Sequence, residues 1–417
     1  MHRGVKGKGE AAMSNPLLVA LLCLVTGDVT EPGPDRVVLA NGREHEGVVV
    51  YEDGEQLVLR VNSRNREFEK KKVESVRATI RELPKALERI AALDLDKIDE
   101  VLALAKDLEG LNLPREARLL YWRVLTLDPS QEEANLALGH RKRQKSWVIP
   151  AEGRWYKLEN LTDVRQDWGS AWEFETTHYK LRTNLPLAAA LTIAIDLERF
   201  YFGFYAILGP GLRLHHVTEP MEVWIHADQA SYPMGPRPGV YVSRDARLYV
   251  NAAGGFSRST MIHEGTHELL DFTARRALPG KGKIPGWLDE GLAVYMQTCA
   301  GGPAGKLEVV PGGVARDRFA IHAGEKKPYR LNRVLNFQSD DFMASSKSHL
   351  KYAQAYTLVH FCLHAEDRRY EAAFFNFLRS AYTGKASSTH FKKAIGVKEK
   401  LLEEAWQEYV SSQSAGR

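Results

Sequence analysis

His263-Glu264-Gly265-Thr266-His267 (HEGTH) is the stretch from which the rest of the chain can be interpreted. Its two histidines are four positions apart, and residues at that spacing share one face of an α-helix. Both imidazoles can therefore bind one metal ion, while Glu264 reaches the same site from the side and can take a proton from an attacking water. The HExxH spacing predicts a metal-dependent hydrolytic site. Because so short a pattern also occurs by chance in amphipathic helices, the surrounding sequence must decide.

A second predicted helix offers a third ligand. Pro285 and Gly286 open the stretch PGWLDEGLAVY, whose apolar residues recur at helical spacing. Glu290 lies in it, next to Gly291 and close to Trp287. A carboxylate packed across from the first helix completes a His/His/Glu set with an open fourth position, which distinguishes a catalytic zinc from a structural one. The alternative is a surface carboxylate stabilised by the helix dipole. The apolar neighbours favour the ligand.

A third helical stretch, YAQAYTLVHF, carries an aromatic stripe. Tyr352, Tyr356 and His360 are each four positions apart in it, so they share one face. A phenol or imidazole on that face can donate a hydrogen bond to the oxyanion of a tetrahedral intermediate. An aromatic stripe is also typical of a buried core, and spacing alone favours that interpretation.

These three stretches, HEGTH, WLDEGLAVY and YAQAYTLVHF, resemble in their order the motifs of the gluzincin metallopeptidases. They are more closely similar to an uncharacterised bacterial family of peptidase-MA-like proteins. The resemblance implies an α+β zincin-type catalytic domain over residues 165–417. It also implies that His263, His267 and Glu290 bind zinc and that Glu264 is the general base.

The resemblance also bears on the aromatic stripe. Aminopeptidase-type gluzincins have a catalytic tyrosine at the start of a Tyr-x-Lys-Gly helix, and Tyr352 matches it. Gln354 and Ala355 stand where the lysine and glycine would be, so Tyr356 and His360 remain competing candidates. The motif Gly-x-Met-x-Asn, which recognises a free amino terminus, has no clear counterpart upstream. An aminopeptidase activity is therefore unsupported.

A predicted β-hairpin precedes the motif helix. Residues 239–251 (GVYVSRDARLYVN) alternate apolar and polar side chains on both sides of a polar turn. In gluzincins, an edge strand at the place of Arg247–Asn251 pairs with extended substrate. The alternative is that this strand is simply one more member of the sheet.

Two smaller parts precede the catalytic region. Residues 34–78 form short alternating runs with Asn-Gly and Asp-Gly turns, which predicts a small barrel similar to SH3-like and Sm-like barrels. Residues 80–145 are predicted to be helical. Residues 117–129 match the offsets of the second helix of a tetratricopeptide unit, and Leu138-Gly139 falls in the same register one repeat on. A plain helical hairpin is the alternative. We expect these parts to be spacers or docking sites for a protein partner.

Residues 1–30 are typical of a secretory signal, with basic residues before an apolar run that is too short for a stable membrane span. No other stretch is predicted to cross a bilayer. The 57 basic and 53 acidic residues give a net charge of +4, which offers no argument for nucleic-acid binding. Only Cys299 and Cys362 follow the leader, so no disulfide framework is expected.

The sequence thus predicts a secreted or periplasmic zinc metallopeptidase that acts on peptides or proteins. Two other hypotheses remain. In one, the protein is a scaffold that binds a partner through its front domains and has an idle zinc site. In the other, it is a zinc hydrolase of a non-peptide amide, such as a bond in a cell-wall polymer.

Overall fold

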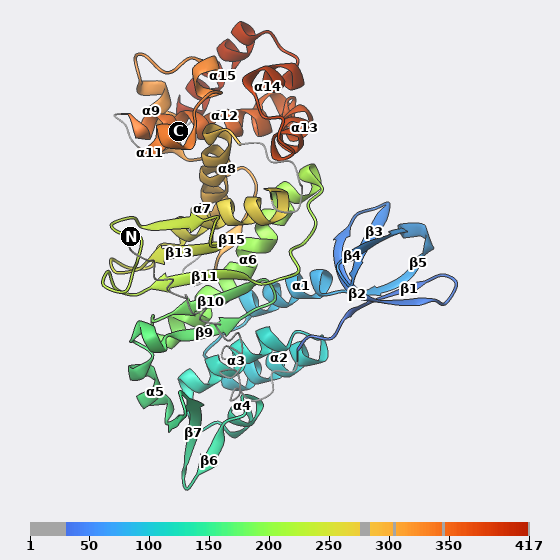
Figure 1. Cartoon of the computed structure of the whole chain (residues 1–417), viewed down its shortest axis with the longest axis vertical. Helices are drawn as coiled ribbons and strands as arrows, with labels where there is room; N and C mark the ends of the chain where they lie inside the picture. The colour runs from blue at the N-terminus through green and yellow to red at the C-terminus, as the bar shows by residue number, and fades with distance from the viewer. Residues whose placement is uncertain (1–30, 276–283, 303–305, 344–346, 416–417) are drawn as a thin grey trace, which may run out of the picture.

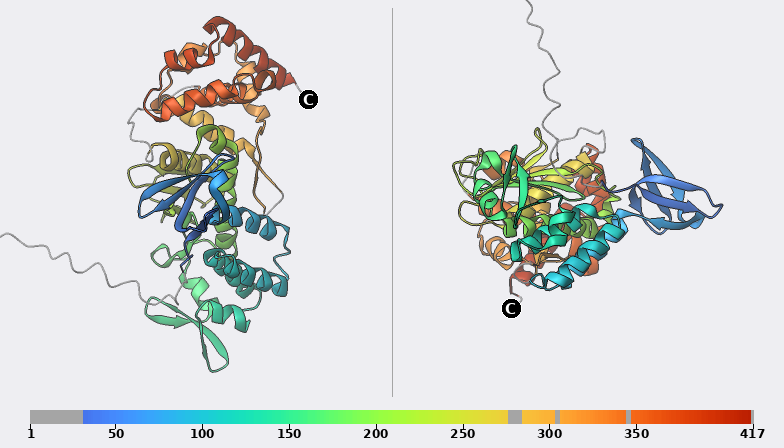
Figure 2. Two further views of the ribbon diagram at one scale, coloured as in Figure 1. Left: turned by 90° about the vertical axis from the view of Figure 1, so that its right-hand side faces the viewer. Right: turned by 90° about the horizontal axis from the view of Figure 1, so that it is seen from below.

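The computed structural model describes residues 31–275, 284–302, 306–343 and 347–415. Figure 1 shows a small N-terminal sheet that projects to one side of an elongated body. The same sheet stands away from the body in the right-hand view of Figure 2, which shows the molecule from below. The body consists of helices and a second five-stranded sheet, with a helical lobe built from the C-terminal residues at one end. The chain is therefore a mixed α+β protein with several sheets. The predicted signal segment, residues 1–30, lies outside the described residues.

The projecting sheet is antiparallel, in the order β4-β3-β2-β1-β5. Its strands are β1 (Asp35–Leu39), β2 (Glu44–Glu52), β3 (Gln56–Val61), β4 (Arg64–Glu69) and β5 (Val73–Arg77). Val37, Val49, Leu57 and Leu59 form a small core on one face. No hydrogen-bonded ladder joins β4 to β5 among the described residues, so the barrel predicted for residues 34–78 is not closed by hydrogen bonds. Both of these outer strands consist mainly of exposed residues, which gives them little apolar surface to bring them together.

Four helices come next, within the region predicted to be helical. They are α1 (Thr79–Ala92), α2 (Ile98–Gly110), α3 (Pro114–Leu127) and α4 (Glu132–Ala137). Helices α2 and α3 pack against each other as a pair, but no repeat of this pair is found in the described chain. The backbone leaves the helical region at Gly139, which has a φ of +73°, and a β-strand begins there instead of a second unit. Helices α1 and α3 pack on the body through α6 (Leu187–Leu212), so the segment is not a free-standing array.

A three-stranded hairpin sheet joins the front of the chain to the body. It contains β6 (Arg141–Arg143), β7 (Ser146–Ala151) and β8 (Arg154–Tyr156), and α5 (Leu158–Val164) packs on it. At the lower end of Figure 1, the β6–β7 hairpin projects from the molecule.

The central sheet has the order β12-β13-β11-β10-β9. Its strands are β9 (Trp172–Glu175), β10 (Tyr179–Thr183), β11 (Met221–His226), β12 (Gly239–Val242) and β13 (Arg247–Asn251). The three middle strands are parallel, and both outer strands run antiparallel to their neighbours. The long apolar helix α6 (Leu187–Leu212) packs against this sheet and is buried along most of its length.

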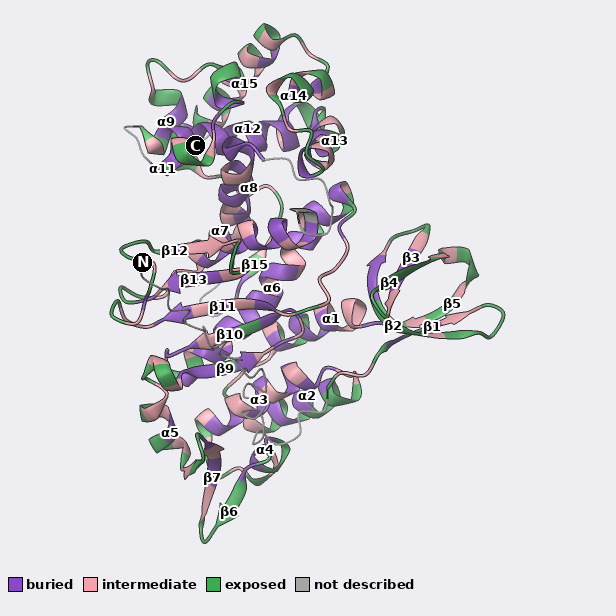
Figure 3. Cartoon of the chain, viewed as in Figure 1, coloured by how far each residue is buried: buried purple, intermediate pink, exposed green. Residues whose placement is uncertain are grey.

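The remaining helices build the site and the lobe beyond it. Helix α7 (Arg258–Leu270) packs on α8 (Gly286–Cys299), which in turn packs on α12 (Ser348–Arg368). Figure 3 shows that α8 and α12 are mostly buried. The other elements are α9 (Arg316–Gly324), α10 (Leu331–Val334), α11 (Ser339–Met343), α13 (Glu371–Tyr382), α14 (Ser388–Ile395), α15 (Glu399–Ala415), β14 (Ala300–Gly301) and β15 (Glu308–Val309).

Two further features concern cysteines and membranes. Cys299 and Cys362 are both free thiols in buried positions. Within the described ranges, no helix combines the length and apolar character that crossing a membrane requires.

Candidate metal site and its cleft

Helix α7 is fixed at its start by two polar contacts. The Ser257 side chain caps the helix by accepting a hydrogen bond from the backbone N–H of Thr260 at 3.2 Å. The next residue, Arg258, donates to the buried Asp196 of α6 at 2.6 Å. Met261, Ile262 and Leu269 are buried against the body. This packing leaves the face that carries the two histidines turned toward α8.

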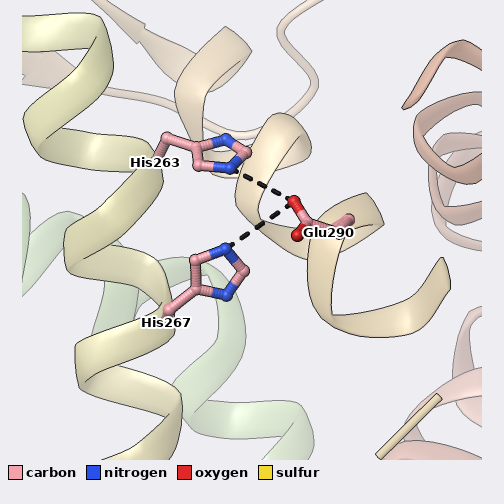
Figure 4. Close-up of side chains that lie close together, drawn as sticks. All are labelled: His263, His267 and Glu290. Atoms are coloured by element: carbon pink, nitrogen blue, oxygen red, sulfur yellow. Dashed lines mark ion pairs between the residues drawn. The ribbon is translucent and has the colours of Figure 1, made fainter. Parts of the chain in front are cut away.

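The three predicted ligands come together between α7 and α8 (Figure 4). His263 Nε2 lies 3.3 Å and His267 Nε2 lies 3.8 Å from Glu290 Oε2. One ligand atom from each residue falls within 4.8 Å of the others, so the group could hold a metal ion. With bonds of about 2.0–2.1 Å, the ligand atoms of a tetrahedral zinc lie roughly 3.3 Å apart. The observed separations are close to that spacing.

The local electrostatics also fit a cation. Apart from its contacts with the two imidazoles, Glu290 Oε2 is buried without a hydrogen bond within the described structure, so it is an acceptor that a cation would satisfy. Burial alone would raise the pKa of Glu290, but its contacts with His263 and His267 lower that pKa to about 2. Burial favours a neutral His267, whereas Asp289 and Glu290 raise its pKa well above the usual value. The carboxylates therefore favour positive charge between them. Nitrogen and oxygen donors of this kind suit zinc, although the arrangement does not itself identify the metal.

Asp289 is a site residue that the sequence reasoning missed. Its Oδ1 lies 3.3 Å from Nδ1 of His267, on the side of the ring opposite the nitrogen that faces Glu290. A carboxylate in this position orients a ligand imidazole and makes it more basic. Two signals in the sequence could have indicated this role. Asp289 comes directly before Glu290 in the same helix, and a histidine that binds a metal usually has a carboxylate or carbonyl oxygen next to its second ring nitrogen.

Glu264 is held by the neighbouring sheet. Its Oε2 accepts a hydrogen bond from the backbone N–H of Tyr241 in β12 at 3.0 Å. Gly239 makes this contact possible, since a Cβ there would lie 2.6 Å from the Thr260 side chain and 3.2 Å from that of Glu264. The carboxylate therefore lies at the junction of α7 and the strand next to it.

The structure decides between the two interpretations of Arg247–Asn251. These residues form β13, which lies inside the sheet between β12 and β11, so they are one more member of the sheet and not the edge strand that the gluzincin resemblance implied. The edge is β12, the first strand of the hairpin. In a two-stranded hairpin at the end of a sheet, one strand pairs with the sheet and the other becomes the edge. Here β13 pairs in parallel with β11, so β12 is the edge strand. Sequence alternation alone does not contain that information.

Of the three aromatic candidates on α12, Tyr352 lies at the site. Its ring centroid is 6.4 Å from that of His263, and its side chain lines the same cleft as the three ligands. Burial, followed by the charges of Glu290 and Glu264, raises the pKa of the phenol, which is therefore protonated at neutral pH. A protonated phenol can donate a hydrogen bond.

Tyr356 and His360 lie in the core instead. The Tyr356 hydroxyl donates to the carbonyl oxygen of Gly313 at 2.9 Å and accepts from the backbone N–H of Ala315 at 3.0 Å. His360 Nδ1 is 2.8 Å from the Tyr409 hydroxyl, and burial lowers the pKa of His360 to about 3. Neither residue lines the cleft that contains the ligands. Their contacts join α12 to the loop before α9 and to α15.

The cleft itself has a volume of about 630 Å³, within the usual range for ligand sites. The residues that line it come from β12 and the segment before it, from α7 and α8, and from α9, α11 and α12. Its acidic side chains, Glu264, Asp289 and Glu290, all belong to the metal site or adjoin it. Besides histidines, the basic side chains among the described residues that line it are Arg237 and Arg318.

The comparisons with known proteins agree with this location. A family described as "Protein of unknown function (DUF1570)" matches residues 257–386. No curated protein matches the chain. The matched range begins at the cap of α7 and continues past α13, and so it contains all three members of the His263, His267 and Glu290 group.

Proposed function

We propose that this protein is a zinc-dependent peptidase that acts outside the cytoplasm. The observation that carries the proposal is the convergence of His263, His267 and Glu290 in a cleft that also contains Glu264 and Tyr352. Three ligands with room for a fourth are typical of catalytic zinc sites. The extracytoplasmic location rests on the predicted signal in residues 1–30.

Each residue of the site has a role in this proposal. A zinc ion bound by the three ligands would polarise the scissile carbonyl and make an attacking water more acidic. Glu264 takes the proton from the attacking water and passes it to the leaving amine. The Tyr352 hydroxyl donates a hydrogen bond to the oxygen that becomes negatively charged during attack.

Substrate alignment is assigned to β12. It is the edge strand of the central sheet and lines the cleft, so an extended peptide can add to it as a further strand. The backbone N–H of Tyr241 donates its hydrogen bond to Glu264. The outer edge of β12 therefore lies beside the proposed general base. We assign the projecting β1–β5 sheet to docking of a protein partner, because it projects from the body (Figure 1) and none of its residues is among those that line the cleft.

The proposal is tested by metal analysis of the purified chain together with activity assays. We expect about one zinc per chain and cleavage of a library of internally quenched peptides. Glu264→Gln should keep the metal and lose turnover, because the ligands remain while the base is gone. Glu290→Ala should lose the metal as well as turnover.

Two results would overturn the proposal. A zinc-free protein whose activity survives His263→Ala would refute the site. Stoichiometric zinc without cleavage of any peptide would support the idle scaffold, unless cell-wall fragments are cleaved in the parallel assay. Cleavage of those fragments alone would indicate a hydrolase of non-peptide amides.

A further inference from the structure

We propose that the cleft selects substrates that carry a carboxylate, and that Arg318 is the residue that binds it. This inference rests on the proposed peptidase function, because it names the substrate class of the same cleft. It is carried by the position of Arg318, by the lack of a close acidic partner among the described residues, and by the distribution of charge along the cleft.

Arg318 is placed in the cleft by a well-anchored element. It lies in the first turn of α9, and the two hydrogen bonds of the Tyr356 hydroxyl hold the backbone directly before this helix. The next residue, Phe319, is fully buried. The charge of Arg318 is close enough to Tyr352 to lower the pKa of that phenol in part, against burial and two carboxylates that raise it. The guanidinium is therefore near the reacting centre on a backbone that is already fixed.

The charge of Arg318 is poorly compensated within the described part of the protein. Its side chain is 24% exposed, and its ion pair is a 3.9 Å contact with the neighbouring Asp317, whose side chain is 74% exposed. Arg123 has the same exposure but pairs with Asp96 at 2.6 Å, and Arg182 at 26% pairs with Glu173 at 2.9 Å. A half-buried guanidinium without a close acid is unfavourable, and a planar carboxylate matches its fork of donors.

The other charges of the cleft point to the same ligand. Its acidic side chains belong to the proposed metal site, where a bound zinc and the histidines would balance them, and the two arginines come from different segments of the lining. Arg237, in the segment before β12, is exposed and hence more screened by solvent. A substrate carboxylate would gain charge-assisted hydrogen bonds at Arg318 that a neutral side chain cannot form.

Two sources of this carboxylate exist, an aspartate or glutamate side chain and the free carboxyl terminus of the substrate. Three sets of quenched peptides separate them. The first contains glutamate and an amidated terminus, the second has glutamine in its place with the same amide, and the third has glutamine and a free terminus. Steady-state kcat and KM are measured for the full chain, Arg318→Gln and Arg318→Lys.

We expect wild-type kcat/KM to be about 10- to 100-fold higher for one of the two carboxylate-bearing sets than for the neutral set. Arg318→Gln should remove the preference, mainly by raising KM for the carboxylate-bearing set. Arg318→Lys should recover part of it, since the charge remains without the fork. Arg316→Gln is the matched control, because Arg316 is exposed in the same turn and does not line the cleft. It should keep the preference.

A binding measurement separates this inference from the proposed function. Affinity of one peptide from each of the three sets for Glu264→Gln, with and without Arg318→Gln, is measured by calorimetry at two salt concentrations. Loss of affinity on removing Arg318, without any peptide cleavage by the wild type, would refute the peptidase and keep the carboxylate site. Equal cleavage of all three sets, or an equal fall in kcat for all sets in Arg318→Gln, would overturn the inference and leave the peptidase standing.

Discussion

Tyr352 and Tyr356 are one helical turn apart on α12 and have the same side chain, yet their surroundings differ. The first lines the cleft beside His263, and the second makes two hydrogen bonds to backbone in the core. Tyr352→Phe removes the donor to the developing oxyanion. We expect kcat on a cleaved peptide to fall about 10²- to 10³-fold, with bound zinc and thermal unfolding unchanged.

Tyr356→Phe is the matched control. It leaves the backbone N–H of Ala315 without its acceptor, whereas the carbonyl oxygen of Gly313 keeps the hydrogen bond from the Thr298 hydroxyl, so the free energy of unfolding should fall by about 1–3 kcal/mol. Activity per folded molecule should stay within a few-fold of wild type. The reverse pattern, with kcat lost in Tyr356→Phe and retained in Tyr352→Phe, would contradict the assignment of the donor.

At the scale of single residues, the sequence was sufficient to predict the three residues that come together as a possible metal-binding group, but not to choose among the aromatic candidates. The two histidines are four apart on one helix, and that spacing alone fixes their common face. The aromatic stripe of α12 has the same spacing, but the part of the helix that carries it, residues 350–363, is almost entirely buried, so polarity does not mark a face toward the cleft. The partners that distinguish the candidates, Gly313 and Tyr409, are distant in sequence.

At the scale of elements, Gly291 sets how closely α8 approaches α12. A Cβ at this position would lie 2.8 Å from the carbonyl oxygen of Ala355 and 2.8 Å from a methyl group of Val359. Gly291→Ala should therefore push the helices apart and displace the adjacent Glu290. We expect a loss of about 1–3 kcal/mol in the free energy of unfolding, and weaker zinc retention in a chelator titration.

Gly324 provides the control for that substitution. It is the last residue of α9, and a Cβ there would meet nothing within 4 Å. Gly324→Ala should be neutral or slightly stabilising, because alanine has the higher helix propensity. Unchanged stability and zinc retention in Gly291→Ala would show that the helix contact does not position the ligand.

Elements were predictable where the signal is local. The hairpin predicted for residues 239–251, from alternation on both sides of a polar turn, is formed by β12 and β13. Closure of the β1–β5 sheet depends on whether β4 meets β5, and a second helical unit depends on whether the chain stays helical beyond α4. Both are decided by tertiary packing and by a helix end at Gly139, so a match to repeat offsets over residues 117–129 could not settle them.

At the scale of the whole molecule, acid should destabilise this fold through buried histidines. His140, His226, His322 and His360 are each at most 6% exposed. Burial lowers their pKa values, to about 4 for the first three and about 3 for His360. In the unfolded chain the pKa of each imidazole is about 6.5. Below that pH the unfolded state binds more protons than the native state, so stability is complete above about pH 6.5 and falls as the pH approaches the folded values.

As the pH falls from 7 to 5, each of these histidines should lower the free energy of unfolding by on the order of 1–2 kcal/mol. In metal-free protein His267 acts in the opposite direction, because its raised pKa favours the native state as the pH falls. The net loss should still be on the order of 3 kcal/mol or more, measured by urea unfolding in chelator at pH 7, 6 and 5. His322→Gln should make the decline shallower, whereas replacing the exposed His390 by glutamine should not. A stability that is constant from pH 7 to pH 5 would show that these imidazoles are protonated without cost, and hence that the native interior admits water at the positions where the structure buries them.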